Sequence, residues 1–253
     1  MKNLGAAVLA VALLAGPAGA IAADKTVVVV LAASSTKGAM DEIAAAFEKA
    51  HPEISIQTSY AGSKVIAAQI QQGAAVDFVL ISESVVRDLG GALTDVTPMD
   101  RNHTAIVVST AAAAKIHGPA DLIKSGVRLG GGTPGSNVDR VAAETVGKIA
   151  KRLGGDFAAK FAANVTSTKT DNAKLAAALE SGTIDAAILY SSDAVAGKTV
   201  AIELPEGDRV YELHDAAIAK VSTHQAAARQ LLALLLSPEG TAIFRRHHHD
   251  PAH

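Results

Sequence analysis

Short polar turns follow several predicted strands, and their residue types suit the binding of an anion. Residues 34–36 are Ser, Ser and Thr, residues 62–63 are Gly and Ser, and Asn172 opens a later predicted helix. A Gly-rich turn at residues 130–136 completes the set. Hydroxyls and the free N–H groups of helix N-termini donate hydrogen bonds to an anion without requiring a full positive charge. Four such turns around one cleft would form an anion-binding site.

Helix capping is the alternative role for each of these serines, because Ser is a preferred residue at helix N-caps. Ser35 and Ser63 differ from the others in that they follow two successive predicted strands. If those strands are parallel, both side chains lie at the edge of the sheet where ligands of doubly wound folds bind. The two roles are compatible, so the sequence leaves both open at these positions.

Composition and motifs exclude several other classes of function. The chain has 23 Lys and Arg against 25 Asp and Glu, five Phe, three Tyr and no Trp. It therefore lacks the basic excess and the stacking platforms of nucleic-acid-binding proteins. Without Cys it has no thiolate nucleophile and no Cys zinc site. The sequence contains no H-E-x-x-H or G-x-S-x-G motif, and we predict no cofactor.

Two further motifs are rejected because of their context. Residues 130–135 match the dinucleotide-binding pattern G-x-G-x-x-G, but Pro134 lies inside it and no suitable acidic residue follows. Histidines 247–249 and His253 could bind a divalent metal, yet consecutive residues near a chain end rarely form a closed site. The last predicted helix stops at Ser237–Pro238, so these histidines are interpreted as a mobile terminus. No metal site is predicted.

Residues 1–22 form a predicted signal peptide. Lys2 supplies the positive start, residues 4–15 are apolar, and small residues precede cleavage after Ala20 or Ala22. This apolar run is shorter than the roughly 20 residues that a membrane-spanning helix needs. We therefore expect an exported protein in the periplasm.

Strands alternate with helical patterns along the rest of the chain, as in α/β folds. Residues 26–81 predict β-α-β-α-β, and residues 127–190 repeat this style, with a strand at 127–129 before the Gly-rich turn. The extended runs 104–109 and 210–219 are candidates to cross between two lobes. We predict two lobes, each a doubly wound, mostly parallel sheet. Lobe 1 would comprise residues 23–105 and 215–253, and lobe 2 residues 106–214.

Five stretches of the chain resemble the periplasmic molybdate-binding proteins of bacterial ABC importers. They are LAASSTKGAM at 31–40, SYAGS at 59–63, QIQQGAAVD at 69–77, ILYSSDA at 188–194 and IFRR at 243–246. The resemblance covers nearly all of the predicted mature chain. It implies the two-lobed type II solute-binding fold with two crossover strands. It also implies a monomer that captures a small oxyanion for the membrane subunits of an ABC importer.

The same resemblance implies roles for particular residues. In that family, serines at the positions of Ser35 and Ser63 bind the oxyanion through hydroxyl and backbone N–H groups. A backbone N–H at the position of Asn172 adds a bond, and a tyrosine matching Tyr190 supports the site. The Gly-rich turn departs from the family pattern, because SNVDRV at 136–141 replaces Pro, Ala-Gly and an aromatic residue. The candidate ligand-binding residues are Ser34, Ser35, Ser63, Lys64, Val138, Arg140, Asn172 and Tyr190.

Charged residues beside the serines leave two alternatives open. Arg binds carboxylates in bidentate geometry, so the ligand could be an organic acid rather than an oxyanion. The same fold also hosts aconitate isomerase, which interconverts trans- and cis-aconitate and needs a base and cationic clamps. The candidate catalytic residues are then Asp139, His214 and Arg140, with His103 as another base and Lys37 and Lys64 as further clamps. We favour the receptor over the enzyme, because solvated helix faces explain most of these charges.

Overall fold

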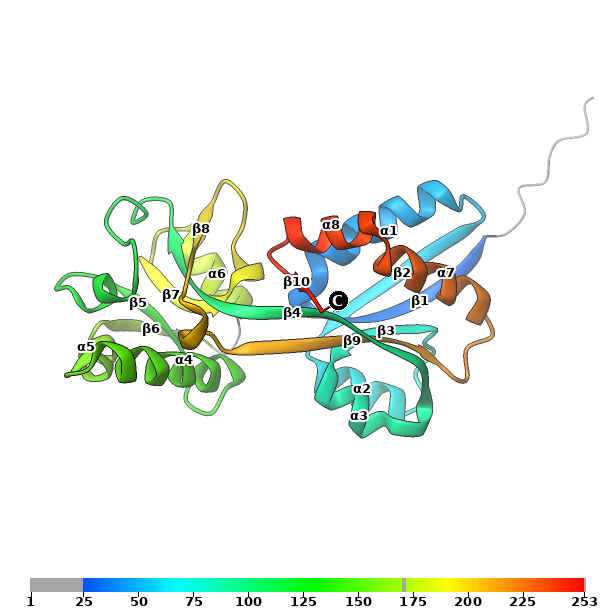
Figure 1. The fold of residues 1–253 in the computed structure, drawn as a ribbon, viewed down its shortest axis with the longest axis horizontal. Helices are drawn as coiled ribbons and strands as arrows, with labels where there is room; N and C mark the ends of the chain where they lie inside the picture. Colours follow the sequence, from blue (N-terminus) through cyan, green and yellow to red (C-terminus); the bar gives the residue numbers. More distant parts are fainter. Residues whose placement is uncertain (1–24, 170–171, 253) are drawn as a thin grey trace, which may run out of the picture.

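The computed structural model describes residues 25–169 and 172–252. The predicted signal peptide, residues 1–22, lies outside the described residues. Two α/β lobes lie side by side, and two long strands run between them (Figure 1). The predicted two-lobed α/β architecture is confirmed.

Lobe 1 is built around β1 (Thr26–Ala33), which pairs in parallel with β2 (Ile54–Ala61) and β3 (Phe78–Ser82). The apolar sequence of β1 explains its central place, since Val28 and Val30 are fully buried, as in a strand covered on both faces. Helices cover both faces of this sheet (Figure 1). They are α1 (Lys37–Ala50), α7 (Gln225–Leu236) and α8 (Pro238–Arg246) on one face, and α2 (Ser63–Gln71) and α3 (Glu83–Leu89) on the other.

Lobe 2 repeats this layered arrangement. Strand β5 (Leu129–Gly132) pairs in parallel with β6 (Val165–Lys169) and β7 (Ala186–Tyr190). One core packs α4 and α5 against the sheet, and a second packs α6 against its other face. These helices are α4 (Asn137–Leu153), α5 (Phe157–Ala163) and α6 (Asn172–Glu180).

Two antiparallel strands, β4 (Leu93–Ser109) and β9 (Tyr211–Ala219), join the lobes. In lobe 1, β9 pairs with β3, and in lobe 2, β4 pairs with β7 and β8 (Thr199–Glu203). The sheet order is β2-β1-β3-β9-β4-β7-β5-β6. Short elements complete the fold: 3-10 helices η1 (Ser34–Thr36), η2 (Gly90–Ala92), η3 (Pro119–Ile123), η4 (Ser191–Asp193) and η5 (Glu206–Asp208), and strand β10 (Asp250–Pro251).

Part of the predicted Gly-rich turn is a strand instead. The strand expected at residues 127–129 starts at Leu129 and continues through Gly132. Close packing explains the glycines: a Cβ on Gly130 would lie 2.4 Å from Ile184 Cδ1, and one on Gly132 would lie 2.0 Å from the backbone N of Asp139. Glycine is therefore required where the first turn of α4 approaches the strand.

The predicted mobile terminus is wrong for histidines 247–249, while His253 lies outside the described residues. The helix predicted to stop at Ser237–Pro238 does so, since α7 ends at Leu236, but it is not the last one. A further helix, α8, begins there, because Ser237 Oγ accepts a hydrogen bond from Gly240 N–H over 3.1 Å and Pro suits the first helical turn. Phe244 then packs in the core of lobe 1, and the chain continues to β10, which pairs with β4. His249 is 1% exposed and is part of the folded structure.

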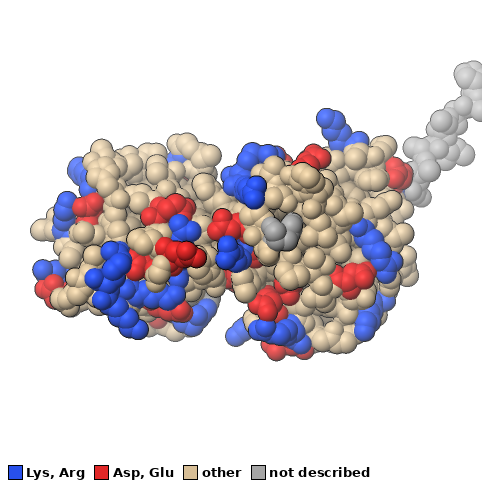
Figure 2. Space-filling view, viewed as in Figure 1, with Lys and Arg blue, Asp and Glu red and all other residues tan. Residues whose placement is uncertain are grey.

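Charges of both signs are interspersed over the face of the molecule in Figure 2, and acidic and basic side chains meet at the narrow waist between the lobes. This pattern agrees with the formal net charge of -2. None of the helices in the described part of the chain is long and apolar enough to cross a membrane.

Two glycine substitutions test the close packing of β5 against α4. Gly132→Ala should destabilise the protein by about 2 kcal/mol or more, because the backbone of Asp139 would have to move. Gly147→Ala, within α4 and with open space around its Cβ, should stabilise it by roughly 0.5–1 kcal/mol. Urea unfolding followed by circular dichroism measures both. Equal stability of Gly132→Ala and the unmodified protein would contradict the packing argument.

Candidate anion-binding cleft

A cleft of about 780 Å³ opens between the two lobes. All eight residues predicted to bind the ligand line it: Ser34, Ser35, Ser63, Lys64, Val138, Arg140, Asn172 and Tyr190. The lining also includes residues that the sequence did not indicate, chiefly Ser82, Ser84, Asp193 and Glu212. Residues 133–136 of the Gly-rich turn are not among the described lining residues, so lobe 2 contributes the start of α4 instead.

Ser35 and Ser63 lie at the same sheet edge because the strands before them are parallel neighbours. The register pairs Ala33, at the end of β1, with Ala61, at the end of β2. Neither serine is a helix N-cap: those positions are Thr36 for α1 and Gly62 for α2, and neither cap makes a side-chain hydrogen bond. The capping alternative therefore does not hold for these serines, whose hydroxyls contact other partners.

The hydroxyl of Ser63 is oriented by Ser82. Ser82 N–H donates to Ser63 Oγ over 3.1 Å, and the two hydroxyl oxygens lie 3.0 Å apart. Ser82 Oγ donates in turn to Glu212 Oε1 over 2.8 Å. Because Ser63 Oγ already accepts a backbone hydrogen bond, its O–H is left to donate to Ser82 Oγ or, in its place, to an anion in the cleft.

Ser35 contacts a buried histidine. His214 Nε2 lies 3.3 Å from Ser35 Oγ, and His214 Nδ1 lies 3.2 Å from Asp100 Oδ2. The ring of His214 is fully enclosed behind Ser35 and is not part of the cleft lining. Of the predicted catalytic bases, His214 is the one that contacts a serine of the candidate site.

Asn172 and Tyr190 line the cleft from lobe 2, and Asp193 fixes both. Asp193 Oδ2 accepts hydrogen bonds from Asn172 Nδ2 over 2.5 Å and from Tyr190 N–H over 3.1 Å. Burial outweighs these hydrogen bonds and raises the pKa of Asp193 to about 6. Burial, followed by the negative charge of Glu212, raises the pKa of the Tyr190 phenol, which therefore keeps its proton at neutral pH.

Positive and negative side chains both line the cleft. Lys64 and Arg140 are exposed, and Arg140 Nη1 lies 3.8 Å from Glu144 Oε2. Glu212 and Asp193 supply carboxylates, while Val138 is buried and packs in a core of lobe 2. Since the charges oppose one another, recognition of an anion depends on the hydroxyl, amide and N–H donors between them.

Three residues predicted near the ligand of the alternative enzyme, Lys37, Asp139 and His103, lie elsewhere. Lys37 forms an ion pair with Asp41 at 2.6 Å on the surface of α1. The Asp139 carboxylate accepts a hydrogen bond from Gly135 N–H over 3.0 Å, which ties it to the turn before α4. Neither residue lines the cleft, and His103 does not line it either. The structure thus does not bring the predicted base Asp139 or the predicted clamp Lys37 to the candidate site.

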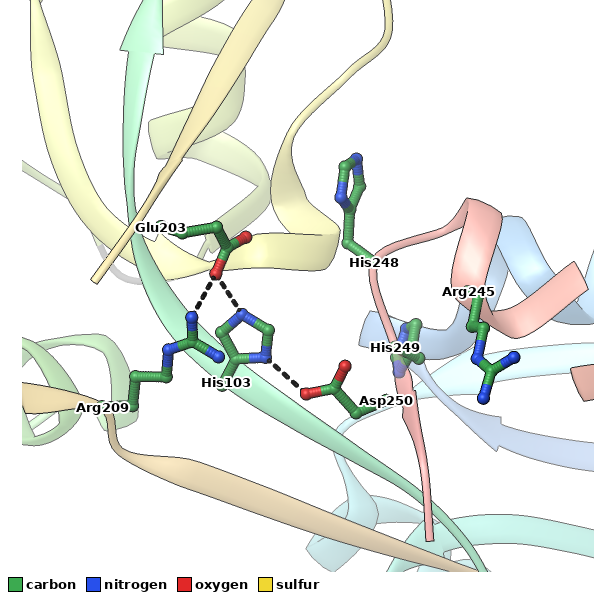
Figure 3. Close-up of a pocket in the computed structure, with 7 residues that line it drawn as sticks. All are labelled: His103, Glu203, Arg209, Arg245, His248, His249 and Asp250. Carbon is green, nitrogen blue, oxygen red and sulfur yellow. Dashed lines mark hydrogen bonds and ion pairs between the residues drawn. The ribbon is translucent and has the colours of Figure 1, made fainter. Parts of the chain in front are cut away.

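His103 lines a separate cavity of about 290 Å³ at the waist (Figure 3). Its Nε2 lies 2.6 Å from Glu203 Oε2 of β8, and its Nδ1 lies 3.3 Å from Asp250 Oδ2 of β10. Arg209 Nη2 lies 3.1 Å from the same Glu203 oxygen. The ring of His103 therefore links β8 of lobe 2 to the C-terminal segment, which gives it a role in joining the lobes.

Some of the missed residues carried a sequence signal and others did not. Ser82 is the last residue of β3 and comes directly after the apolar run at 78–81, much as Ser35 and Ser63 come after β1 and β2, so the rule that identified those two would also have identified Ser82. Glu212 gives no such signal, because it is a single acidic residue within a strand. Its position in the cleft follows from the pairing of β9 with β4, which the sequence does not reveal.

Replacing Asp193 with Asn should stabilise the protein at neutral pH. The pKa of Asp193 is raised in the fold from 3.8 to about 6, so its stabilising contribution is complete below about pH 4 and is lost as the pH rises through 6. An Asn carbonyl can accept both hydrogen bonds that now reach Oδ2, without a buried charge. Melting temperatures of Asp193→Asn and the unmodified protein should therefore agree near pH 4 and diverge by pH 7.

Asp88→Asn is the matched control, because Asp88 is exposed on α3. It should change the melting temperature little at either pH. A melting temperature of Asp193→Asn that tracks the unmodified protein from pH 4 to pH 7 would contradict the assignment of a raised pKa.

Comparison with known proteins places the chain in a family. Residues 28–249 match the sequence model of the family described as bacterial extracellular solute-binding protein. The chain is 26% identical over 233 residues to the molybdate-binding protein ModA of Mycobacterium tuberculosis, covering 90% of this chain and 85% of that protein. It is 27% identical over 232 residues to the putative ABC transporter substrate-binding lipoprotein YvgL of Bacillus subtilis, covering 88% and 86%.

A solved structure supports the fold. The substrate-binding domain of a putative molybdenum ABC transporter from Clostridium difficile superposes with a TM-score of 0.74 at 21% identity, covering 90% of this chain and 100% of that chain. The predicted type II solute-binding fold and the predicted resemblance to molybdate-binding proteins are both confirmed. The chain belongs to the bacterial extracellular solute-binding proteins.

Proposed function

We propose that this chain is the receptor of an ABC importer and that its cleft binds a small oxyanion of the molybdate type. The names of its relatives, a molybdate-binding protein and a putative ABC transporter substrate-binding lipoprotein, support this proposal. The observation that carries it is the placement of Ser35 and Ser63 on neighbouring strand ends, with Asn172 and Tyr190 on the opposite wall of one cleft. The receptor would act outside the cytoplasmic membrane, after export by the predicted signal peptide.

The chemistry of the cleft suits a compact oxyanion. Such an ion has hydrogen-bond acceptors on every side, and the cleft offers neutral donors from both lobes: two serine hydroxyls, a buried phenol and an asparagine. Each hydrogen bond to a charged group contributes roughly 1.5–3 kcal/mol net. A few such bonds therefore provide useful affinity without a dominant cationic side chain.

The two crossing strands suit a receptor that closes around its ligand. β4 and β9 form the paired connection between the lobes beside the cleft, so a bend in these strands would change the width of the cleft. An anion that contacts both lobes binds the closed form more tightly than the open one and shifts the population toward it. A closed receptor gives the membrane subunits of an importer a shape to recognise.

Organic acids are the alternative ligands, because Lys64 and Arg140 line the cleft and suit carboxylates. The binding test therefore includes them. An aconitate isomerase is less well supported. It needs a base beside its substrate. Asp139 lies outside the cleft, and His214 is enclosed behind Ser35.

A panel of anions tests the proposal by thermal shift. Molybdate or tungstate should raise the melting temperature of the protein clearly, since a ligand at 100 times its dissociation constant adds about 2.7 kcal/mol. Sulfate, phosphate, citrate and trans-aconitate complete the panel. A shift with citrate or trans-aconitate alone would replace the oxyanion by an organic acid, and conversion of trans- to cis-aconitate would replace the receptor by an enzyme.

Serine variants test the location of the site. Ser35→Ala and Ser63→Ala should each weaken binding of the anion about tenfold or more, because each removes a hydrogen bond to a charged ligand. Ser125→Ala, at an exposed turn away from the cleft, should bind as the unmodified protein does. Unchanged affinity in the Ser35→Ala/Ser63→Ala double variant would show that the ligand binds elsewhere.

A further inference from the structure

We propose that the cleft takes up a proton together with its anion, and that His214, behind Ser35, carries this proton. His214 is then a positioning residue: it does not touch the ligand but directs the hydroxyl that does. The inference deepens the proposed function of the same cleft and rests on it.

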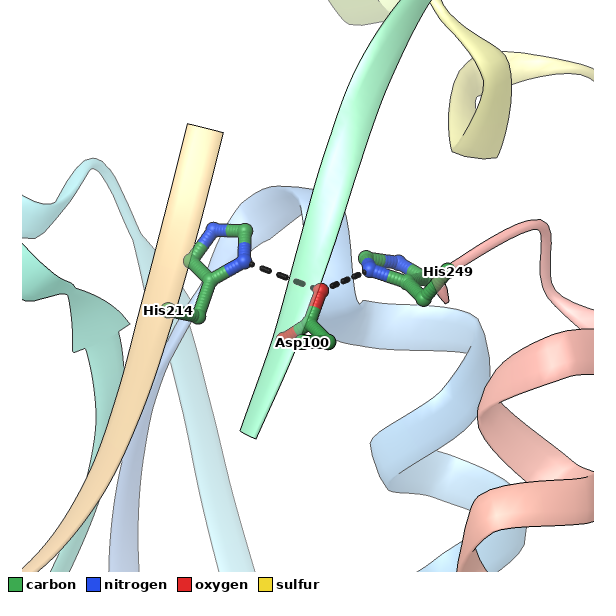
Figure 4. A group of neighbouring side chains, drawn as sticks. All are labelled: Asp100, His214 and His249. Atoms are coloured by element: carbon green, nitrogen blue, oxygen red, sulfur yellow. Dashed lines mark hydrogen bonds and ion pairs between the residues drawn. The ribbon is translucent and has the colours of Figure 1, made fainter. Parts of the chain in front are cut away.

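His214 belongs to a buried cluster with Asp100 and His249 (Figure 4). Asp100 and His214 are direct partners in the register of β4 and β9. Asp100 Oδ2 lies between the rings, 3.2 Å from His214 Nδ1 and in a short hydrogen bond with His249 Nδ1. All three side chains are fully buried.

Both rings extend from Asp100 to the same residue of the cleft. His214 Nε2 lies 3.3 Å from Ser35 Oγ, and His249 Nε2 lies 3.2 Å from the backbone oxygen of Ser35. The cluster thus holds Ser35 by its hydroxyl and by its carbonyl. No other serine of the cleft has such a contact among the described residues.

Acceptors face both ring nitrogens of His249: the carboxylate of Asp100 and the carbonyl of Ser35. An imidazole donates from both nitrogens only when both carry a proton, so these two contacts favour the doubly protonated ring beside the Asp100 carboxylate. Burial would raise the pKa of Asp100, but the two histidines hold it below its ordinary value. Asp100 therefore remains a carboxylate.

His214 has two states with opposite effects on Ser35. Its Nδ1 faces Asp100 and carries a proton in both. In the neutral ring, Nε2 accepts the Ser35 O–H, so the hydroxyl presents its lone pairs to the cleft and repels an anion. In the imidazolium, Nε2–H donates to Ser35 Oγ, which turns the O–H toward the cleft. The anion therefore binds the protonated state more tightly.

Three carboxylates that face His214 favour its charged form: Asp100 from β4, and Glu212 and Asp215 from its own strand. The ring of His249 from the C-terminal segment also faces it, with the ring centroids 6.1 Å apart, and a positive charge there opposes that form. Burial alone would lower the pKa of His214, but the carboxylates of Asp100, Glu212 and Asp215 raise it above 6.5. Glu212 Oε2 lies 3.8 Å from His214 Nε2, so the proton also offsets the carboxylate that lines the cleft.

Two other roles for this cluster are less well supported. Ser35, His214 and Asp100 have the contacts of a nucleophile, base and orienting acid, but a base must be neutral to accept a proton. The surrounding carboxylates favour the charged ring instead. A bound metal would place the three donors around a common centre, whereas both histidines direct their nitrogens at one carboxylate oxygen (Figure 4).

Calorimetric titration with molybdate tests the proton uptake. Titrations in two buffers of different ionisation enthalpy give the number of protons taken up, which should approach one per anion above the pKa of His214. Affinity should fall by up to about tenfold per pH unit as the pH rises above the pKa of His214. Binding that is independent of pH and releases or takes up no proton would overturn the proposal.

His214→Gln should bind molybdate with no proton uptake and no decrease at high pH, because the Gln amide can donate to Ser35 but does not titrate. His117→Gln, at an exposed loop position, is the matched control and should keep the proton uptake of the unmodified protein. Uptake that persists in His214→Gln would assign the proton to another group and overturn the proposal. So would phosphonylation of Ser35 by a fluorophosphonate probe with loss of fluoride, or a zinc-induced thermal shift that is lost in His214→Gln.

A ligand-free measurement separates this inference from the proposed function. Ring ¹⁵N chemical shifts of His214, assigned by comparison with His214→Gln, report which nitrogens carry protons. A ligand-free ring that carries protons on both nitrogens at low pH and loses the Nε2 proton as the pH rises supports the proposal even if no anion of the panel binds, a result that would refute only the oxyanion receptor. A ring whose protonation does not change over the pH range of the binding measurements would overturn the proposal while leaving the receptor intact.

Discussion

The antiparallel pairing of β4 with β9 is the constraint on which the rest of the structure depends. These strands are the connection between the lobes, and their register decides which side chains meet at the waist. It places Asp100 opposite His214 and Asn102 opposite Glu212. The alternation of side chains along a strand then brings Glu212 and His214 to one face, beneath Ser82 and Ser35. A shift of one residue would turn both charged groups away from the cleft.

The buried cluster at this crossing places a carboxylate in the interior, which costs stability unless other groups compensate it. Asp100 is fully enclosed, and its Oδ1 has no hydrogen-bond partner among the described residues. A buried carboxylate is tolerated only where charge and hydrogen bonds compensate it, and here two histidines do so. The cluster ties together β4, β9, the C-terminal segment and the turn that carries Ser35. An apolar core at this place would pack as well, but it could not direct a hydroxyl.

Sequence patterns predicted the fold and the serine side of the cleft because they depend on local chemistry, and the resemblance to molybdate-binding proteins added Tyr190 on the other side. The apolar run of β1, the helix spacing of α1 and the serines after two strands are each readable within a few residues. The contacts behind those serines are not, because His214 lies 179 positions from Ser35 and His249 lies 214 positions from it. The histidine run was misread for a related reason. Only the docking of α8 on lobe 1 distinguishes an anchored segment from a free end.

Glu212 is the least expected residue in an anion site, and its contacts explain why it is compatible with one. Its Oε1 accepts the hydroxyl proton of Ser82, and its Oε2 faces His214. Both oxygens are thus directed at protein groups rather than at the space where a ligand would lie. The carboxylate accepts the hydrogen bond of the Ser82 hydroxyl, so Ser82 Oγ acts as an acceptor toward Ser63. The Ser63 O–H is then the donor that can turn from Ser82 to an anion in the cleft. Glu212 also faces Nε2 of His214 and favours the imidazolium form of that ring. In that form the ring donates to Ser35 Oγ, and the Ser35 O–H points into the cleft. A single negative side chain therefore orients both serine donors toward a negative ligand, and it does so because it binds their partners and not the ligand itself.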